Sequence, residues 1–252
     1  MKFGIAGNGR AAHHFAKMLY DKGHVLTQVY GRTPNDLAAN FNAEFISSPS
    51  LFSTENEVIF LAVSDDAIAS VANEISEEQF VVHASGMTSI DIISHRRKGV
   101  AWPIQSLTKS KELKYDEIPF LIEGTNQETE GFLMDLFSSI SKKTLRANSE
   151  QRSRVHIAAV FANNFTNHLF ELSADFLHES GFDFDILLPM IHAHIEKLSV
   201  MTPHEAQTGP AVRMDRHTIE KQQALLKSNL ALLEIYNTIT NSILQKFHGK
   251  KL

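Results

Sequence analysis

The sequence has no cysteine, which excludes disulfide scaffolds, thiol catalysis and cysteine-ligated zinc, and suits a reducing cytosol. It also lacks a long hydrophobic run: the longest clean one, residues 58–63, is far shorter than the roughly 20 residues that span a bilayer. Basic residues are not in excess, because 24 Lys and Arg stand against 29 Asp and Glu. Binding to nucleic acid, which depends on neutralising phosphates, is therefore disfavoured. We expect a cytoplasmic protein with no signal peptide and no membrane partner.

Metal catalysis is disfavoured as well, although the chain contains 13 histidines. His192 and His194 lie two positions apart, and on a helix such side chains point in different directions. The His-x-x-x-His pattern with a nearby glutamate, typical of helical zinc sites, is absent from the sequence. The Gly-x-Ser-x-Gly turn of serine hydrolases is absent too. We expect neither a metal centre nor a serine nucleophile.

Short apolar runs alternate with helical patterns over residues 1–148. Strands are predicted at residues 2–6, 25–30, 44–46, 58–63, 79–84, 119–123 and 143–146. Helices are predicted at residues 10–22, 65–73 and 128–140, with a further helix start at Thr33. Such alternation is typical of βαβ units. The pattern predicts an α/β domain of the Rossmann-like type, a doubly wound parallel sheet, over residues 1–148.

Residues 149–252 have a helical pattern instead. Ser149 is a suitable N-cap, and neither proline nor glycine follows until Gly181, so one helix of about 30 residues is predicted. Further helices are predicted at residues 184–198 and 218–247, separated by an irregular segment that contains Pro203, Gly209 and Pro210. An all-helical domain is therefore expected over residues 149–252.

The first predicted strand runs into Gly7-Asn8-Gly9-Arg10-Ala11-Ala12, a Gly-x-Gly-x-x-Ala turn at the start of a helix. In dinucleotide-binding folds the first glycine makes the tight turn and the second lets the pyrophosphate approach the backbone. The N–H groups at the helix start then face the phosphates. The context predicts a dinucleotide site, and the alternative is a tight turn without a ligand.

The second strand ends at Gly31-Arg32-Thr33, where an NAD site usually places an acidic residue. A cation and a hydroxyl suit the 2′-phosphate of NADP better, and the alternative is a solvated arginine. Four further residues lie at the ends of the fourth and fifth strands or just after them, and are predicted to line the nicotinamide region: Val63, Ser64, His83 and Ser85. Asp65 and Asp66 are assigned instead to capping of the next helix.

Polar residues in the long helix are candidates for catalysis. His156 and Asn163 are seven positions apart and share a helix face, and the helix around them is apolar. Buried polar side chains need partners, which a substrate or a neighbouring helix could supply, and both explanations stay open. We assign the proton donor to His156, because an imidazole has an unperturbed pKa of about 6.5. Asn163 would orient the substrate.

The segment Thr208-Gly209-Pro210-Ala211-Val212-Arg213-Met214-Asp215 places a hydroxyl, a cation and a carboxylate in a loop. Thr208 would orient a substrate carbonyl or imine, and Arg213 would hold a substrate carboxylate. The structural alternative is an ion pair between Arg213 and Asp215 that pins the loop.

The chain resembles NADP oxidoreductases in which a Rossmann-like domain precedes a helical DUF2520 domain. The resemblance depends on the glycine turn and on four further blocks: residues 83–86, residues 102–106, residues 154–165 and residues 207–215. It extends to pyrroline-5-carboxylate reductases, F420-dependent NADP reductases and 6-phosphogluconate dehydrogenases. This implies an all-α domain like the C-terminal domain of 6-phosphogluconate dehydrogenase and a homodimer. One departure is that the long helix lacks the lysine that β-hydroxyacid dehydrogenases use.

The sequence therefore predicts an NADP-dependent oxidoreductase that transfers a hydride to or from a small polar substrate at a cleft between domains. Its catalytic residues would be His156, Asn163, Thr208 and Arg213. The missing lysine motivates an alternative, a non-catalytic sensor or partner protein that binds NADP(H). A third hypothesis is that the helical domain mainly dimerises.

Overall fold

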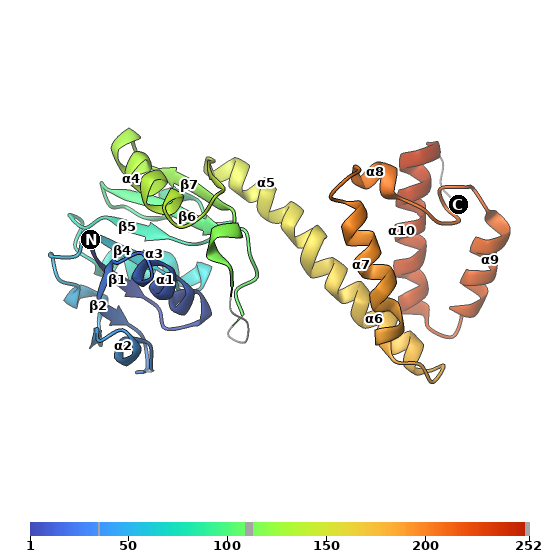
Figure 1. Ribbon diagram of the computed structural model, residues 1–252, viewed down its shortest axis with the longest axis horizontal. Coiled ribbons are helices and arrows are strands. Elements are labelled where there is room, and N and C mark those ends of the chain that lie inside the picture. Colours follow the sequence, from blue (N-terminus) through green and yellow to red (C-terminus); the bar gives the residue numbers. More distant parts are fainter. Residues whose placement is uncertain (35, 109–112, 250–252) are drawn as a thin grey trace. The chain divides into compact units, whose positions relative to one another are not determined.

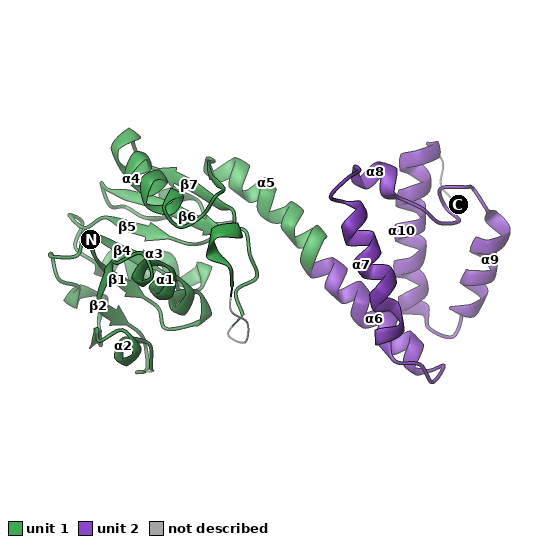
Figure 2. Cartoon of the chain, viewed as in Figure 1, with its two compact units in different colours: residues 1–163 green, residues 164–252 purple. Residues whose placement is uncertain are grey.

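The computed structural model describes residues 1–34, 36–108 and 113–249, which form two compact units, residues 1–163 and residues 164–252 (Figure 2). The division lies inside the helical run that begins at Ser149, whereas the sequence-based border lies at the start of that run. No helix in the described part of the chain is long and apolar enough to cross a membrane.

Unit 1 is built on an eight-stranded sheet with the order β3-β2-β1-β4-β5-β6-β7-β8 (Figure 1). The strands are β1 Lys2–Ala6, β2 Val25–Tyr30, β3 Glu44–Ile46, β4 Val58–Leu61, β5 Val81–His83, β6 Lys98–Pro103, β7 Phe120–Gly124 and β8 Thr144–Arg146. Neighbouring strands are parallel except β6 and β7, which pair antiparallel. The predicted Rossmann-like α/β fold is confirmed, with this one antiparallel pair as a difference.

Strand β6 is absent from the sequence-based prediction because Gly99 and Pro103 are residues that normally weaken a strand. Close packing explains Gly99: a Cβ there would lie 2.5 Å from Leu133 Cδ1 of the covering helix. Pro103 is the last residue of the strand.

Helices cover both faces of the sheet. They are α1 Arg10–Tyr20, α2 Asp36–Asn40, α3 Ile68–Glu74 and α4 Gln127–Ser138. Phe15 of α1 and Phe137 of α4 pack on Phe60 of β4, with ring centroids 5.5 and 6.2 Å away. Its neighbours Ile59 and Leu61 point to the opposite face and join the core under α3, as the alternation of side chains along a strand requires.

Helical residues run without interruption from Ser149 to His178, as α5 Ser149–Ala159, a π-helical turn Val160–Phe165 and α6 Thr166–His178. This agrees with the predicted long helix. The remaining helices are α7 Leu188–Lys197, α8 Pro203–Ala206, α9 Arg216–Leu225 and α10 Leu230–His248. Short 3₁₀ turns lie at Pro49–Leu51, Asp65–Ala67, Ile90–Ile92, Tyr115–Glu117 and Phe184–Leu187.

The prediction of one helix over residues 218–247 is wrong, because α9 ends before α10 begins. Asn229 separates them: its side chain accepts a hydrogen bond of 3.1 Å from the N–H of Leu232 and so caps a new helix. The apolar periodicity continues across the break, which is why the pattern alone did not reveal it.

Candidate functional site

The strand order brings the carboxyl ends of four parallel strands to one edge of the sheet. The chain leaves β1 toward β2 on one side, whereas β4 and β5 lie on the other side (Figure 1). This reversal between β1 and β4 is the position where ligands bind in open α/β sheets. The glycine turn follows β1, and the Arg32–Thr33 segment follows β2. The predicted nicotinamide residues follow β4, end β5 or come just after β5.

Gly7 has the backbone conformation that the tight turn needs. Its φ of +120° is a region that L-residues rarely adopt. A Cβ there would lie 2.3 Å from the carbonyl oxygen of Ala62, and its N–H donates to the carbonyl of Tyr30 at 2.8 Å. The turn is therefore held against the segments that follow β2 and β4, and only glycine fits at this position.

Gly9 lies in open space at the start of α1. A Cβ there would meet no heavy atom of the described residues within 4 Å, and Gly9 is exposed. In the part of the chain that the structure describes, no side chain caps the helix, and its first turn has no acidic residue. The first N–H groups of a helix have no partner within it, and the helix dipole favours an anion there. This cradle fits the pyrophosphate of a dinucleotide, which would approach the backbone at Gly9.

Asn8 connects the glycine turn to the segment after β2. Its Nδ2 donates to the carbonyl of Thr33 at 2.5 Å. The contact is close, because a Cβ on Gly31 would lie 2.6 Å from the same Nδ2. Arg32 and Thr33 are exposed beside the turn. The predicted pyrophosphate contact lies on the glycine turn, and the predicted 2′-phosphate contact lies on the segment after β2. The side chain of Asn8 connects these two segments by its hydrogen bond.

His83 is completely buried at the end of β5. Its Nδ1 accepts a hydrogen bond of 3.2 Å from the N–H of Ser85. Burial, and secondarily the positive charge of Arg152, lower the pKa of His83 to about 3, so the ring stays neutral and able to accept. Direct contact of His83 with a nucleotide stays a prediction, and its burial favours a supporting role for the turn that follows.

Ser85 is also nearly buried, and its hydroxyl organises the same turn. It bonds to Asp65 at 2.8 Å and to the Thr88 hydroxyl at 2.9 Å, and it accepts from two backbone N–H groups. Val63 and Ser64 lie on the neighbouring segment after β4, where Ser64 is exposed. Ser64 makes no capping hydrogen bond to the turn at Asp65–Ala67.

His156 of α5 lies against this turn from the other side. Its imidazole is 5.5 Å from the ring of Trp102 in β6, and the two ring planes are inclined by 45°. A Cβ on Gly86 would lie 2.5 Å from His156 Cδ2 and 2.7 Å from Trp102 Cε2. Gly86 therefore permits a close approach of His156 to the turn, and the half-buried imidazole lies beside the predicted nicotinamide region.

The sequence-based site did not include a second buried group, Arg152 with Glu123. Arg152 is fully buried and pairs with the carboxylate of Glu123 in β7. The available indication was an arginine one turn before His156. Its acidic partner lies 29 positions away on a strand, a pairing that periodicity cannot reveal.

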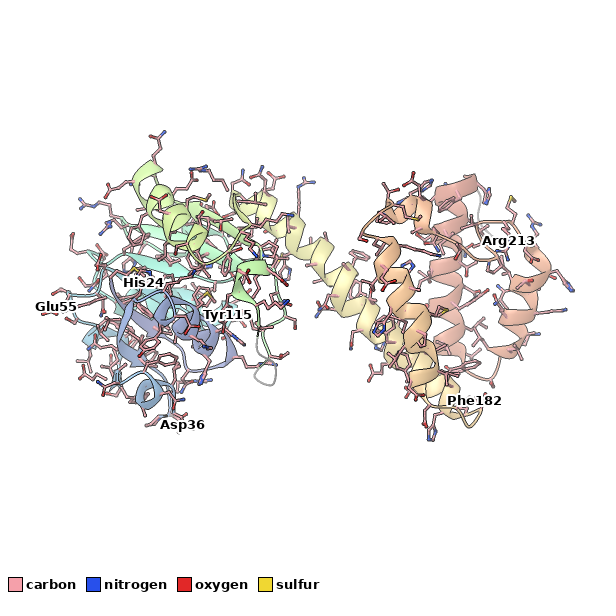
Figure 3. All side chains as sticks on the ribbon, viewed as in Figure 1. His24, Asp36, Glu55, Tyr115, Phe182 and Arg213 are labelled. Atoms are coloured by element: carbon pink, nitrogen blue, oxygen red, sulfur yellow. The ribbon has the colours of Figure 1, made fainter. Side chains whose placement is uncertain are left out.

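The other predicted catalytic residues are divided between the units. Asn163 is exposed in the π-helical turn of unit 1, and π turns occur frequently at functional sites. Thr208 lies in unit 2 on the wall of a hollow of about 610 Å³ between α6, α9 and α10. Arg213 is exposed in the turn before α9 (Figure 3). The assembly of these residues with His156 into one site stays a prediction.

Asp215, the suggested partner of Arg213, caps α9. Its carboxylate accepts from the N–H and the hydroxyl of Thr218 at 3.1 and 2.8 Å. These bonds lower the pKa of Asp215. Asp215 thus fixes the end of the 208–215 segment by capping the helix that follows it. The neighbouring Met214 has an unusual positive φ of 54°.

Family models match both parts of the chain. The model described as "Domain of unknown function (DUF2520)" matches residues 118–243, half of the chain. The chain belongs to the DUF2520 family. The model described as "NADP oxidoreductase coenzyme F420-dependent" matches residues 2–86, which include the glycine turn, Arg32 and His83. The resemblance found in the sequence is confirmed.

Solved structures of the same fold cover nearly the whole chain. A "putative NADP oxidoreductase" from Bacteroides fragilis is 32% identical, with a TM-score of 0.86 over 97% of this chain and 98% of that one. A protein from Thermotoga maritima is 23% identical, with a TM-score of 0.77 over 98% of both chains. A pyrroline carboxylate reductase from Plasmodium falciparum, with NADP bound, is 14% identical, with a TM-score of 0.61 over 97% and 98%. A search of curated proteins gave no significant match.

Proposed function

We propose that this DUF2520 protein is an NADP-dependent oxidoreductase that transfers a hydride to or from a small polar substrate, including one that bears a carboxylate. The observation that carries the proposal is the open, uncapped turn at Gly9, with Arg32 and Thr33 tied beside it by Asn8. The cofactor class agrees with the description of the matching family model and of the Bacteroides fragilis protein.

The residues of unit 1 have separate tasks in this proposal. The turn from Gly7 to Ala11, with Arg10 at the first helical position, holds the pyrophosphate, and Arg32 with Thr33 holds the 2′-phosphate. When bound, the nicotinamide supplies or accepts the hydride. Val63, Ser64 and the turn after His83 exclude water on one side of the reacting carbon.

His156 supplies the proton of the proposed reaction. In the direction of reduction, the substrate carbon gains the hydride, and the electron pair of its double bond moves to oxygen or nitrogen. That atom then takes a proton from the imidazolium of His156. Asn163 and Thr208 orient the substrate, and Arg213 holds its carboxylate by paired hydrogen bonds.

A homodimer through unit 2 is part of the proposal. Helix α7 exposes Met190 at 64% and Ile195 at 59%, and Val200 just beyond it is 80% exposed. A hollow of about 610 Å³ lined mainly by leucine, isoleucine and phenylalanine lies in the same unit. Exposed apolar side chains of this size, together with the apolar hollow, support an interaction site on unit 2. A second copy of the chain is proposed to bind this apolar surface of unit 2. The proposed location of the protein is the cytoplasm.

A non-catalytic NADP(H)-binding sensor is the second candidate. The long helix contains no lysine between Gln151 and Ser180, so chemistry that depends on a lysine at this helix is not available. The sensor hypothesis predicts nucleotide binding without turnover of any small carbonyl or imine compound.

The two candidates differ in one experiment. NADPH oxidation is measured at 340 nm with a panel of keto acids, aldehydes and cyclic imines, using the wild type and His156→Gln. If one compound of the panel causes NADPH oxidation by the wild type but not by His156→Gln, and the variant still binds NADPH, the result supports the oxidoreductase. Turnover that is unchanged in His156→Gln contradicts the role of His156, and binding with no turnover across the panel supports the sensor.

A further inference from the structure

Arg152 is a permanently charged side chain with no exposed surface, and every part of its guanidinium has a partner. Its Nε donates to the carbonyl of Ser85 at 3.1 Å, and one Nη donates to the carboxylate of Glu123. The other Nη donates to the carbonyl of Thr88 and to the hydroxyl of Ser149, the latter at 3.2 Å. Burying such a charge is costly unless it is paired and hydrogen-bonded, so this arrangement requires an explanation.

Two of these partners are carbonyls of one short segment, the turn from Ser85 to Thr88. The opposite side of the same turn is held by His83, whose Nδ1 accepts from the Ser85 N–H. The Ser85 peptide is thus bonded at its N–H by His83 and at its carbonyl by Arg152. The turn is fixed from both sides, and Gly86 at its tip is left facing Trp102 and His156.

Glu123 connects this arrangement to the start of α5. Its carboxylate accepts from the N–H of Ser149 at 3.0 Å and from the Ser149 hydroxyl, in addition to Arg152. The Ser149 hydroxyl accepts in turn from the N–H of Ile90 at 3.1 Å. The first turn of α5 is therefore bonded to β7 and to the segment after β5.

His156 is four positions after Arg152, so it lies one helical turn further along the same face of α5. We propose that Arg152, paired with Glu123, is a positioning residue: it sets the separation between the 85–88 turn and the imidazole of His156. The proposal rests on the proposed function, in which that turn faces the nicotinamide and His156 supplies the proton. Only an arginine fork reaches two carbonyls, a carboxylate and a hydroxyl together, which lysine cannot do with one ammonium group.

The chain contains a single tryptophan, Trp102, which lies in contact with this site and reports on it. An imidazole in contact with an indole alters the emission of the indole. The difference between the Trp102 emission of the nucleotide-free wild type and that of His156→Gln, at one fixed pH, is therefore a His156-dependent component. That component measures the His156–Trp102 contact without any nucleotide or substrate.

The test compares Arg152→Lys with Arg154→Lys on the same helix. Arg154 is exposed and pairs with Glu150, so its variant is the matched control. The proposal predicts that Arg152→Lys loses the His156-dependent component and weakens NADPH binding, whereas Arg154→Lys retains both. Circular dichroism verifies folding. If Arg152→Lys does not fold, Ser149→Ala, which removes one donor to Glu123, is expected to give a partial loss of the same component.

Each outcome has a defined meaning. A folded Arg152→Lys protein with the wild-type Trp102 emission and NADPH affinity overturns the positioning role and leaves the proposed function intact. Absence of any His156-dependent component in the wild type also overturns it, because the contact would then not exist. If the wild type fails to bind NADPH, the proposed function fails, while the comparison of Trp102 emission still tests the positioning of His156.

Discussion

Replacing Gly9 by alanine should separate nucleotide binding from folding. Gly9 has a φ of −84°, which alanine adopts freely, and a Cβ there meets no heavy atom within 4 Å among residues 1–34, 36–108 and 113–249. Restricting the unfolded chain stabilises such a variant by roughly 0.4–1 kcal/mol. Alanine is a poorer N-cap than glycine, which offsets this gain by roughly 0.5–1 kcal/mol. The free energy of unfolding should therefore stay within about 1 kcal/mol of the wild type.

The same methyl group would occupy the space that the pyrophosphate needs beside the first N–H groups of α1. We expect the affinity for NADPH to fall by at least about tenfold, which corresponds to ~1.4 kcal/mol of binding free energy. Gly7→Ala is the comparison variant, in which we expect a large loss of stability. Its Cβ would lie 2.3 Å from the Ala62 carbonyl oxygen at a φ of +120°. Backbone strain costs about 1–3 kcal/mol and overpacking about 1–3 kcal/mol more, so this variant should lose roughly 2–6 kcal/mol of stability.

Urea denaturation followed by Trp102 fluorescence measures the stability of both variants, and calorimetric titration measures NADPH binding. Wild-type NADPH affinity in Gly9→Ala would refute the assignment of the pyrophosphate to this turn. Wild-type stability in Gly7→Ala would refute the described backbone conformation. The two positions are two residues apart in the same turn, so differences between the variants report on the individual glycine and not on the turn as a whole.

Three further predictions concern stability and assembly. The pKa of His83 is about 3 in the folded chain and near 6.5 in the unfolded chain, so the unfolded chain binds the proton more readily. The free energy of unfolding should therefore keep the full contribution of the neutral ring above about pH 6.5 and fall by at most ~1.4 kcal/mol per pH unit as the pH drops toward 3. In urea melts, His83→Gln should flatten this pH dependence. Glu123→Gln leaves Arg152 buried without a counter-charge and should lower the free energy of unfolding by about 3–5 kcal/mol in the same melts. The double variant Arg152→Met with Glu123→Leu should recover most of this loss. Wild-type stability in Glu123→Gln would contradict the described ion pair. Sedimentation should give a dimer that Met190→Asp with Ile195→Asp dissociates, and a wild-type monomer would refute the dimer.

The sequence predicted the sheet edge and its glycine turn because both depend on local patterns. Short apolar runs with helices between them determine parallel strands, and the carboxyl ends of such strands meet at one edge. The positions of Gly7 and Gly9 follow from the turn itself. Strand β6 was missed because packing against Leu133, rather than strand propensity, explains its glycine.

The sequence pattern could not predict contacts between residues that are far apart in the chain. His156 was selected as an imidazole in an apolar helix, but its neighbours Gly86 and Trp102 lie far away in the sequence. His83 was assigned to the nucleotide because it ends a strand at the right edge, whereas its neutral, buried ring supports the Ser85 turn. The break between α9 and α10 depended on one capping side chain, Asn229, inside a continuous apolar period.

Calorimetric titration of the wild type with NADPH, and separately with NADH, tests the central claim most directly. The matched variants are Arg32→Ala and, as control, Arg96→Ala, an exposed arginine remote in sequence from the glycine turn. We predict tight, NADPH-selective binding, with a preference of about tenfold or more that is lost in Arg32→Ala and kept in Arg96→Ala. Failure of the wild type to bind either nucleotide would contradict the account and leave the glycine turn as architecture without a ligand.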